Sequence, residues 1–263
     1  YLPQVRHVEV QIAVDRHKNI IHLGVRDCSI QRRYQKVIEE ALSPGLPDDL
    51  REQIQNAAVE LAHSVGYSSV GTVEFLVDLK EKKFYFIEMN TRLQVEHPVT
   101  EMITDTDIVK EQIRIAAGEP LSHEQKDIQF SGHVIEARIN AENPRTLIPS
   151  PGKILSYHPP GGHGVRVDSA IYSGYTVQPY YDSMIAKLIV KARNREACIQ
   201  KLLVALEEFI IEGIQTNIEQ HKRILTHPDF IEGRFHTKFL DTVDVFAEEE
   251  KECSDELPLS QSA

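Results

Sequence analysis

Five polar side chains stand at every second position in one stretch of the chain. They are Glu88, Asn90, Arg92, Gln94 and Glu96. Because successive side chains of a strand point to opposite faces, an extended chain would point all five the same way. Two carboxylates, two amides and a guanidinium in one row are groups that can hold a metal ion and a small anion. An ordinary solvated face would be richer in lysine and less varied.

The segment that leads into this row predicts a β-hairpin. Two apolar arms are separated by a short polar break at residues 80–82. Pairing Leu79 with Lys83 places Glu74 opposite Glu88, and like charges directly opposite each other destabilise a strand pair. Two interpretations are open. Glu74 and Glu88 considered alone favour a solvated pair, whereas the polar row that follows Glu88 favours a divalent cation between the two carboxylates. Oxygen ligands of this kind suit Mg²⁺ or Mn²⁺.

The elements that must position these side chains follow from hydrophobic periodicity and turn residues. Strands are predicted over residues 5–14, 19–26, 133–141 and 182–191. Helices are predicted over residues 47–66, 99–118, 195–213 and 217–226. The charge-dense segment 26–40 is predicted to leave the sheet as a loop. The mixture is typical of an α+β fold with antiparallel hairpins.

Composition narrows the function classes. The chain has 263 residues, a net charge of −11 and three cysteines in no metal or redox spacing, which favours a reducing, cytoplasmic setting. It has no apolar run that could span a membrane and no basic cluster for nucleic acid. Residues 244–263 carry seven acidic residues and one lysine, which predicts a disordered acidic tail. The chain opens with Tyr-Leu-Pro, as a piece of a longer protein would.

A further group of donors lies upstream of the hairpin. Residues 31–36 (QRRYQK) place Lys36 beside Gln31 and two arginines. Taken alone, this is a solvated basic segment. Beside a carboxylate pair that can hold a metal, it becomes a candidate clamp for phosphate or bicarbonate, because lysine and arginine neutralise such anions.

Several ordered stretches resemble the biotin carboxylase component of biotin-dependent carboxylases, a branch of the ATP-grasp superfamily. They are RHVEVQ, RDCSIQRRYQKVIEE, FIEMNTRLQVEHPVTE, GHVIEARINAE, PSPGKI and PYYDSMIAKLI. The resemblance implies the C-terminal half of an ATP-grasp domain, an antiparallel sheet with helices, over residues 1–125. It implies the biotin carboxylase C-terminal α/β domain over residues 126–243, before the tail. The family's N-terminal domain and most of its glycine-rich lid would precede Tyr1.

The resemblance also implies roles for single residues. Glu74, Glu88 and Asn90 match the group that holds one or two Mg²⁺ or Mn²⁺ ions on the ATP phosphates. The residues that match the family's bicarbonate-binding and biotin-binding residues are Lys36, Arg92, Gln94, Val95 and Arg138. Among these residues, Arg138 would stabilise the biotin enolate. Glu96 matches the general base that deprotonates bicarbonate.

ATP itself is implied to contact a second set of residues: His7, Gln31, Leu76, Ile87 and Glu88. Without the resemblance, Arg138 would be interpreted as an ordinary salt-bridged arginine. Leu76 and Ile87 would be interpreted as residues of the hydrophobic core. Two departures from the family, Tyr34 for histidine and Val25 for glutamate, are expected to alter nucleotide contacts. Asp182 is expected to support the site from behind, and His163 and Arg166 match the region where family dimers meet.

The implied activity is ATP-dependent carboxylation of biotin on a carrier protein, with bicarbonate as donor and carboxyphosphate as intermediate. This is the first half-reaction of acetyl-CoA carboxylase in fatty acid synthesis, and it implies a homodimer with carrier and carboxyltransferase partners. The fragment alone is expected to be inactive. Alternatives remain open: the same component of another acyl-CoA or pyruvate carboxylase, another ATP-grasp ligase such as a carbamoyl-phosphate synthase half, or a non-enzymatic dimerising fragment.

Overall fold

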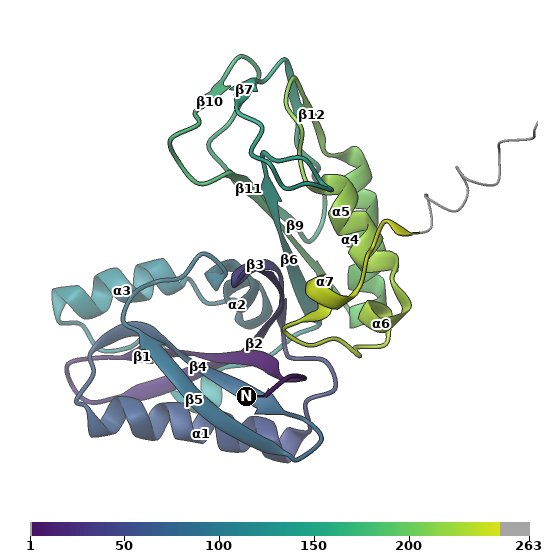
Figure 1. The fold of residues 1–263 in the computed structure, drawn as a ribbon. Coiled ribbons are helices and arrows are strands. Elements are labelled where there is room, and N and C mark those ends of the chain that lie inside the picture. Colours follow the sequence, from purple (N-terminus) through teal and green to yellow (C-terminus); the bar gives the residue numbers. More distant parts are fainter. Residues whose placement is uncertain (1, 248–263) are drawn as a thin grey trace, which may run out of the picture.

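One antiparallel sheet runs through both halves of the molecule. The computed structural model describes residues 2–247. The eight strands lie in the order β5-β4-β1-β2-β3-β6-β11-β9 (Figure 1). Their bounds are β1 Arg6–Val14, β2 Ile20–Arg32, β3 Gln35–Ala41, β4 Ser69–Asp78, β5 Lys83–Asn90, β6 His133–Asn140, β9 Val165–Ser169 and β11 Met184–Ala192. Since β3 pairs with β6, the sheet continues past residue 125, and the division into domains there stays a prediction.

Helices cover this sheet in two groups. In the first half α1 lies against β1 and β2, while α2 and α3 follow the hairpin (Figure 1). In the second half α4 packs on β6 and β11, and α5 packs on α4 and β6. The helices are α1 Asp48–Ser64, α2 His97–Thr104, α3 Ile108–Ala117, α4 Arg195–Glu208, α5 Ile218–Thr226, α6 Pro228–Ile231 and α7 Phe239–Thr242, with a 3₁₀ turn η1 Gln125–Asp127. Two small ribbons pair β7 Gly152–Lys153 with β10 Thr176–Val177 and β8 Ser156–His158 with β12 Ile210–Glu212.

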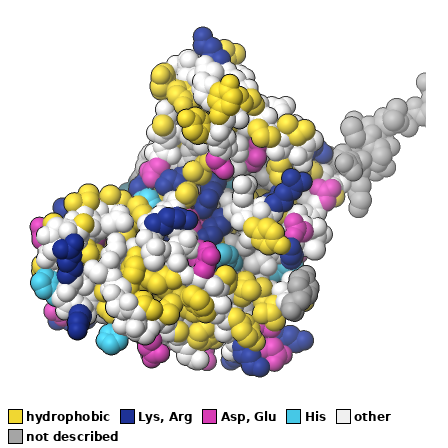
Figure 2. Space-filling model, turned by 60° about the vertical axis from the view of Figure 1, so that its left-hand side comes forward, with side chains coloured by type: hydrophobic (Ala, Val, Ile, Leu, Met, Phe, Trp, Pro, Cys, Tyr) yellow, Lys and Arg dark blue, Asp and Glu magenta, His cyan; other side chains and the backbone are white. Residues whose placement is uncertain are grey.

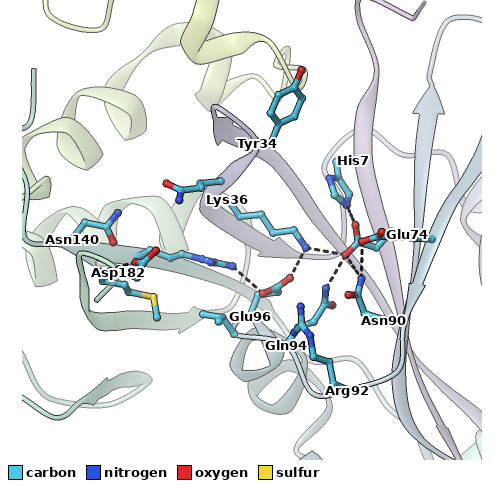
Figure 3. A pocket seen from close by; sticks show the side chains of 15 residues that line it. His7, Tyr34, Lys36, Glu74, Asn90, Arg92, Gln94, Glu96, Asn140 and Asp182 are labelled. Atoms are coloured by element: carbon cyan, nitrogen blue, oxygen red, sulfur yellow. Dashed lines mark hydrogen bonds and ion pairs between the residues drawn. The ribbon is translucent and has the colours of Figure 1, made fainter. Parts of the chain in front are cut away.

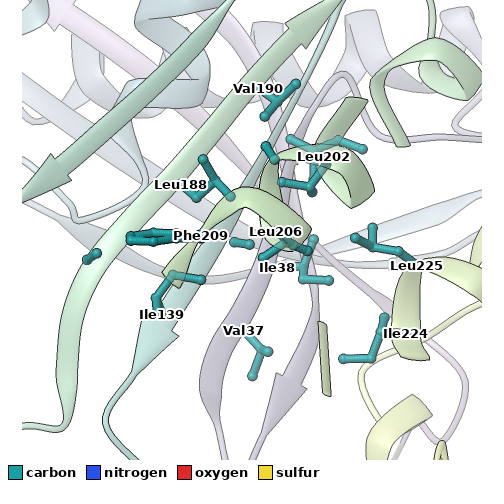
Figure 4. Close-up of a cluster of buried hydrophobic side chains, with 14 of the residues drawn as sticks. Val37, Ile38, Ile139, Leu188, Val190, Leu202, Leu206, Phe209, Ile224 and Leu225 are labelled. Atoms are coloured by element: carbon teal, nitrogen blue, oxygen red, sulfur yellow. The ribbon is translucent and has the colours of Figure 1, made fainter. Parts of the chain in front are cut away.

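The largest core lies between α4 and the second half of the sheet. Leu202 and Leu206 of α4 pack near Leu188 and Val190 of β11 and Ile139 of β6 (Figure 4). Each is buried, and burying one such side chain stabilises a fold by about 1.5–3 kcal/mol. A second cluster joins α1 to β1 and β4. Within residues 2–247 there is no helix both long and apolar enough to cross a membrane.

The prediction of a loop over residues 26–40 is wrong. β2 continues to Arg32, a tight turn follows, and β3 returns along it. The charged residues that suggested a loop are buried in the sheet: Arg26, Asp27, Glu39 and Glu40 are all at most 2% exposed. They can stay there because Arg26, Glu39 and Glu40 each form an ion pair with a residue on another element. The high density of charge in this segment therefore indicates buried ion pairs of the sheet and not a solvated loop.

Two helix predictions were too long. The helix predicted over residues 99–118 is two helices, because Asp105 takes a left-handed conformation (φ 56°) and Asp107 caps α3 by accepting from the Lys110 amide. The helix predicted over residues 195–213 ends at Glu208, and the chain then pairs as β12. Gly213 has φ 98° and a Cβ there would lie 2.2 Å from the Lys153 carbonyl oxygen, so only glycine fits. Helices α1 and α5 were predicted to within two residues at each end.

A buried carboxylate ties α4 to β3. Glu40 accepts from Arg195 at both oxygens, at 2.8 and 2.9 Å, and from His133 at 2.8 Å. Burial would raise the pKa of Glu40, but these donors outweigh it and lower the pKa from 4.5 to about 2. Because a depressed pKa favours the ionised form, this contribution to folding is complete above pH 4.5 and is lost as the pH falls toward 2.

Replacing this carboxylate is therefore expected to remove an acid-sensitive part of the stability. Glu40→Gln should lower the free energy of unfolding at pH 7 by on the order of 3 kcal/mol, since one pKa unit corresponds to about 1.4 kcal/mol. The difference in free energy of unfolding between wild type and Glu40→Gln should shrink as the pH falls below about 4. Urea unfolding across this range measures it, with Glu207→Gln on the exposed side of α4 as the control. A deficit that does not vary with pH would contradict this origin.

Candidate active site

A cavity of about 480 Å³ lies at the junction of the two halves of the sheet (Figure 3). It collects every residue that the sequence assigned to metal, bicarbonate and proton transfer: Lys36, Glu74, Glu88, Asn90, Arg92, Gln94, Val95, Glu96 and Arg138. Asp182, which was expected to support the site from behind, instead lines the cavity itself. Figure 2 shows Lys, Arg and acidic side chains gathered where the molecule narrows between its two lobes. Residues far apart in the sequence thus meet in one polar cavity.

The hairpin places Glu74 opposite Glu88 as predicted, although its turn is paired differently. Lys83 faces Asp78 instead of Leu79, and the register shifts by one residue between Glu74 and Phe75. This bulge on β5 restores the predicted carboxylate pair. The two carboxylates are bridged by Asn90, whose Nδ2 lies 2.9 Å from Glu74 Oε1 and 3.2 Å from Glu88 Oε1.

These side chains fit a hard divalent cation. Burial would raise the pKa of Glu74, but hydrogen bonding from His7 and the charge of Lys36 lower it to about 2, so the carboxylate is ionised. His7 Nε2 lies 2.8 Å from Glu74 Oε2, and the Gln94 amide donates to Oε1 at 2.7 Å. Two carboxylates and an amide at one end of a cavity are the oxygen donors that Mg²⁺ prefers. Glu74, Glu88 and Asn90 would hold it.

The polar row does not continue as a strand. β5 ends at Asn90, residues 91–96 form a loop, and Glu96 directly precedes α2. The expectation of one extended row is therefore wrong beyond Asn90, yet the loop folds back and keeps the row in the cavity. Buried Arg26 fixes part of this loop, because its Nη2 donates to the side-chain Oε1 of Gln94 at 3.1 Å. That contact leaves the amide nitrogen of Gln94 facing Glu74.

Glu96 is clamped between two cations. Lys36 Nζ lies 2.5 Å from Glu96 Oε1, and Arg138 Nη2 lies 2.9 Å from Oε2. Burial lowers the pKa of Lys36, but the carboxylates around it, among them Glu9 and Glu96, reverse this and raise the pKa above its usual value. Burial likewise lowers the pKa of Arg138, and Glu39 and Glu96 raise it. Glu96 itself is 2% exposed, so a bound proton or anion there would be shielded from water.

One buried carboxylate at the centre of these ion pairs was missed by the sequence reasoning. Glu9 is fully buried and binds Arg26 and Lys36, each at 2.5 Å. A signal for it was present, because polar His7, Glu9 and Gln11 alternate with apolar residues along β1. In β1 this period of two marks the face that points to the cavity.

The residues expected to contact ATP line a second cavity of about 520 Å³. His7, Gln31, Leu76 and Ile87 are all there, but Glu88, the fifth residue of the expected set, lines only the first cavity. His7, Glu74 and Tyr34 line both cavities. Thr237, Lys238 and Asp241, which no sequence motif singled out, close it from the C-terminal side. The Lys238 ammonium lies 5.4 Å from the centre of the Tyr34 ring. An apolar pocket beside a polar anion cavity suits a base joined to phosphates.

The last predictions concern Val25, the two expected dimer contacts and the acidic tail. Val25 is buried in the cluster that joins α1 to β1 and β4, and it lines neither cavity, so its effect on nucleotide contacts stays a prediction. Arg166 pairs with Glu101 at 2.7 Å and with Asp168 at 2.8 Å, while His163 lines a separate depression. Both remain predicted dimer contacts. Of the predicted tail, residues 244–247 are described and Phe246 is buried against Arg145; residues 248–263 lie outside the described residues.

Comparison with known families agrees with this arrangement. Residues 1–124 match the model of the carbamoyl-phosphate synthase L chain, ATP binding domain. Residues 136–242 match the model of the biotin carboxylase C-terminal domain. The chain belongs to the biotin carboxylase family. Its fold is the family's α+β arrangement, with the ATP-grasp antiparallel sheet and its helices.

Relatives of this chain carry the names of more than one carboxylase. It is 56% identical to biotin carboxylase 1 of Bacillus subtilis over 93% of the chain, and 54% identical to a pyruvate carboxylase subunit of Methanothermobacter thermautotrophicus over 92%. These matches cover 55% and 49% of the relatives, so the chain spans about half their length.

Solved structures show the same pattern of similarity. The Campylobacter jejuni biotin carboxylase complex with β,γ-ATP matches with a TM-score of 0.90 and 47% identity, over 92% of this chain and 54% of that one. The biotin carboxylase domain dimer of Hydrogenobacter thermophilus 2-oxoglutarate carboxylase, in complex with MgADP, ADP and bicarbonate, matches with a TM-score of 0.89 and 50% identity. This second match covers 92% of this chain and 53% of that one.

Proposed function

We propose that the protein carrying this chain uses ATP and bicarbonate to carboxylate biotin on a carrier protein. One observation carries the proposal: Glu96 lies between Lys36 and Arg138 in a cavity that is also lined by the carboxylates of Glu74 and Glu88, which suit a metal ion. The named ligands of the Hydrogenobacter thermophilus structure, magnesium, ADP and bicarbonate, are those that such a cavity would hold.

The side chains divide the work as follows. Lys36, Arg92, Gln94 and the Val95 backbone bind bicarbonate, and Lys187 donates to the Val95 carbonyl at 3.0 Å, which fixes that peptide. Glu96 removes the bicarbonate proton, so that the anion attacks the γ-phosphorus of ATP and releases ADP. Mg²⁺ held by Glu74, Glu88 and Asn90 supplies charge neutralisation at the phosphates.

Biotin is carboxylated in the second step. Carboxyphosphate breaks into CO₂ and phosphate, and the phosphate takes the proton from biotin N1. Arg138, charged and aimed into the cavity, stabilises the negative oxygen of the biotin enolate as it attacks CO₂. His7, Gln31, Leu76 and Ile87 hold the nucleotide in the adjoining pocket.

The finer assignment is to acetyl-CoA carboxylase and so to fatty acid synthesis, with a carrier protein and a carboxyltransferase as partners and a homodimer as the working form. Curated relatives named simply biotin carboxylase support it. Relatives and structures named for pyruvate and 2-oxoglutarate carboxylases keep those acceptors as alternatives. Cys28 and Cys198 are buried free thiols, which suits the proposed cytoplasmic location. Mn²⁺ would suit the same oxygen ligands as Mg²⁺.

Comparing two lengths of the protein tests the proposal. ATP cleavage with Mg²⁺, bicarbonate and free biotin should be at background for this chain, and should appear when the chain is restored to the length of its relatives. We expect this difference because positioning of the phosphates supplies most of phosphoryl-transfer catalysis, and the resemblance places the family's phosphate-holding lid before Tyr1. ATP cleavage without biotin stimulation in the restored chain would favour another ATP-grasp ligase. Robust carboxylation by this chain alone would show that the site is complete here.

A further inference from the structure

Two glutamates face each other directly behind Arg138. Glu39 of β3 and Glu136 of β6 are register partners, and both are fully buried. Directly opposed residues of an antiparallel pair have Cβ atoms about 5 Å apart, so their carboxyl groups are within reach of each other. Neither residue was singled out by its sequence pattern, and neither lines the cavity.

Three of the four carboxylate oxygens of Glu39 and Glu136 lack a hydrogen-bond donor among the described residues. Glu39 Oε1 accepts from Arg138 Nε at 2.5 Å. Glu39 Oε2 and both oxygens of Glu136 have no donor among the described residues. Two facing ionised carboxylates, one without any donor, would be strongly unfavourable in a dry interior. One proton on Glu136 changes this, because its O–H can donate to the free Glu39 Oε2.

The surrounding charges leave Glu136 without a dedicated cation among residues 2–247. Arg138 is shared between Glu39 and Glu96. Lys187 donates to the Val95 carbonyl and pairs with Asp168 at 3.3 Å.

Helix α2 covers the same side of the sheet, and its charged groups are also committed. There Glu101 pairs with Arg166 and lies 3.8 Å from His97. Burial and the facing Glu39 raise the pKa of Glu136 well above its usual value. Burial raises the pKa of Glu39 to about 7, against the lowering effect of Arg138.

We propose that Glu39 and Glu136 share one proton and that this pair is the positioning element for Arg138. With Glu136 neutral, Glu39 is the single negative charge behind the guanidinium, and Arg138 can extend to Glu96 and the cavity. Loss of the shared proton would add a second negative charge behind Arg138 and draw the guanidinium away from Glu96. The protonation rests on the geometry alone, while its value for enolate stabilisation rests on the proposed function.

Infrared spectroscopy of this 263-residue chain tests the shared proton without catalysis. Wild-type protein at neutral pH should show the C=O band of a protonated carboxyl group, shifted in D₂O. Glu136→Gln should remove that band, and Glu52→Gln, an exposed glutamate on α1, should keep it. Absence of the band in the wild-type protein, or a band unchanged in both Glu136→Gln and Glu39→Gln, would overturn the proposal.

The pH dependence of stability gives a second readout. A carboxyl group with a raised pKa holds its proton longer in the folded state, so its contribution falls as the pH rises from about 4.5 through the folded pKa. Glutamine keeps a donor at every pH. The folding equilibrium constant of Glu136→Gln relative to wild type should therefore rise with pH, by up to about tenfold per pH unit in that window. A ratio that is flat between about pH 5 and 9 would overturn the shared proton.

The positioning role has its own test in the restored chain. The alkaline fall of kcat that comes from Glu136 ionisation should be absent from Glu136→Gln and present in Glu52→Gln. Identical alkaline limbs in wild type and Glu136→Gln would remove the positioning role. Failure of the restored chain to carboxylate biotin would contradict the proposed function and leave the spectroscopic and stability results standing.

Discussion

Glu96→Gln in the restored chain is expected to reduce bicarbonate-dependent ATP cleavage by about 10²–10⁴-fold, the usual contribution of a positioned general base. Glutamine keeps the shape but has a single acceptor oxygen, so it can accept from only one of Lys36 and Arg138, which hold the two oxygens of Glu96 at 2.5 and 2.9 Å. It cannot remove the bicarbonate proton. Steady-state kinetics measure the loss, which should fall on kcat because the nucleotide pocket does not include Glu96.

The matched control for this variant is Glu52→Gln, an exposed glutamate far along the sequence on α1. It should have wild-type kinetics and an unchanged unfolding curve. If Glu96→Gln retains more than about a tenth of the wild-type rate, another group takes the proton, and the general-base assignment fails.

The largest expected stability effect belongs to Arg26. Its guanidinium is fully buried and donates to Glu9, Gln11, Thr72, Gln94 and Thr100. Arg26→Met should lower the free energy of unfolding by about 3–5 kcal/mol, because removing one partner leaves a buried carboxylate poorly compensated. Glu9 would keep Lys36 at 2.5 Å and the His7 ring at 3.9 Å.

Urea unfolding of this chain measures that difference, and Arg234→Met is the control. Arg234 is 54% exposed at its side chain and pairs with Asp229 on the surface. Exposed pairs contribute at most about 1 kcal/mol, so the control should be nearly neutral. Equal effects from the two variants would mean that the buried network around Arg26 does not stabilise the fold.

The carboxylate pair could be predicted from the sequence because strand pairing is periodic. Counting back from the turn reached Glu74 and Glu88, and the prediction is correct even though the turn pairs Lys83 with Asp78. A bulge next to Glu74 compensates for the difference of one residue. A single sequence does not show a bulge, since it is an irregularity of pairing and leaves no pattern of its own.

Buried charge could not be predicted from the same reasoning. Segment 26–40 was expected to form a loop because charged residues are usually solvated. Its strands are interior because Arg26 meets Glu9, and Glu40 meets Arg195, which lies 155 residues away in sequence. Such pairs depend on tertiary contacts. The resemblance did identify the cavity residues, but it gave no reason for Glu9, Glu39 or Glu136.

The C-terminal wall of the nucleotide pocket was missed for a similar reason. Thr237, Lys238 and Asp241 belong to a short helix and its approach, a segment without strong periodicity. They reach the pocket because the chain crosses back to β2 after α6, and α7 lies against that strand (Figure 1). Contacts between residues so far apart in the sequence can be assigned only when the three-dimensional fold is known.

Transfer of labelled carbon from bicarbonate to free biotin by the restored chain tests the central claim most directly. With ATP and Mg²⁺ present, label should accumulate in biotin in proportion to the ATP cleaved, and omission of ATP or the Glu96→Gln change should abolish it. ATP cleavage that depends on bicarbonate but leaves biotin unlabelled would contradict the account. The chemistry would then belong to another ligase built on the same metal-binding hairpin.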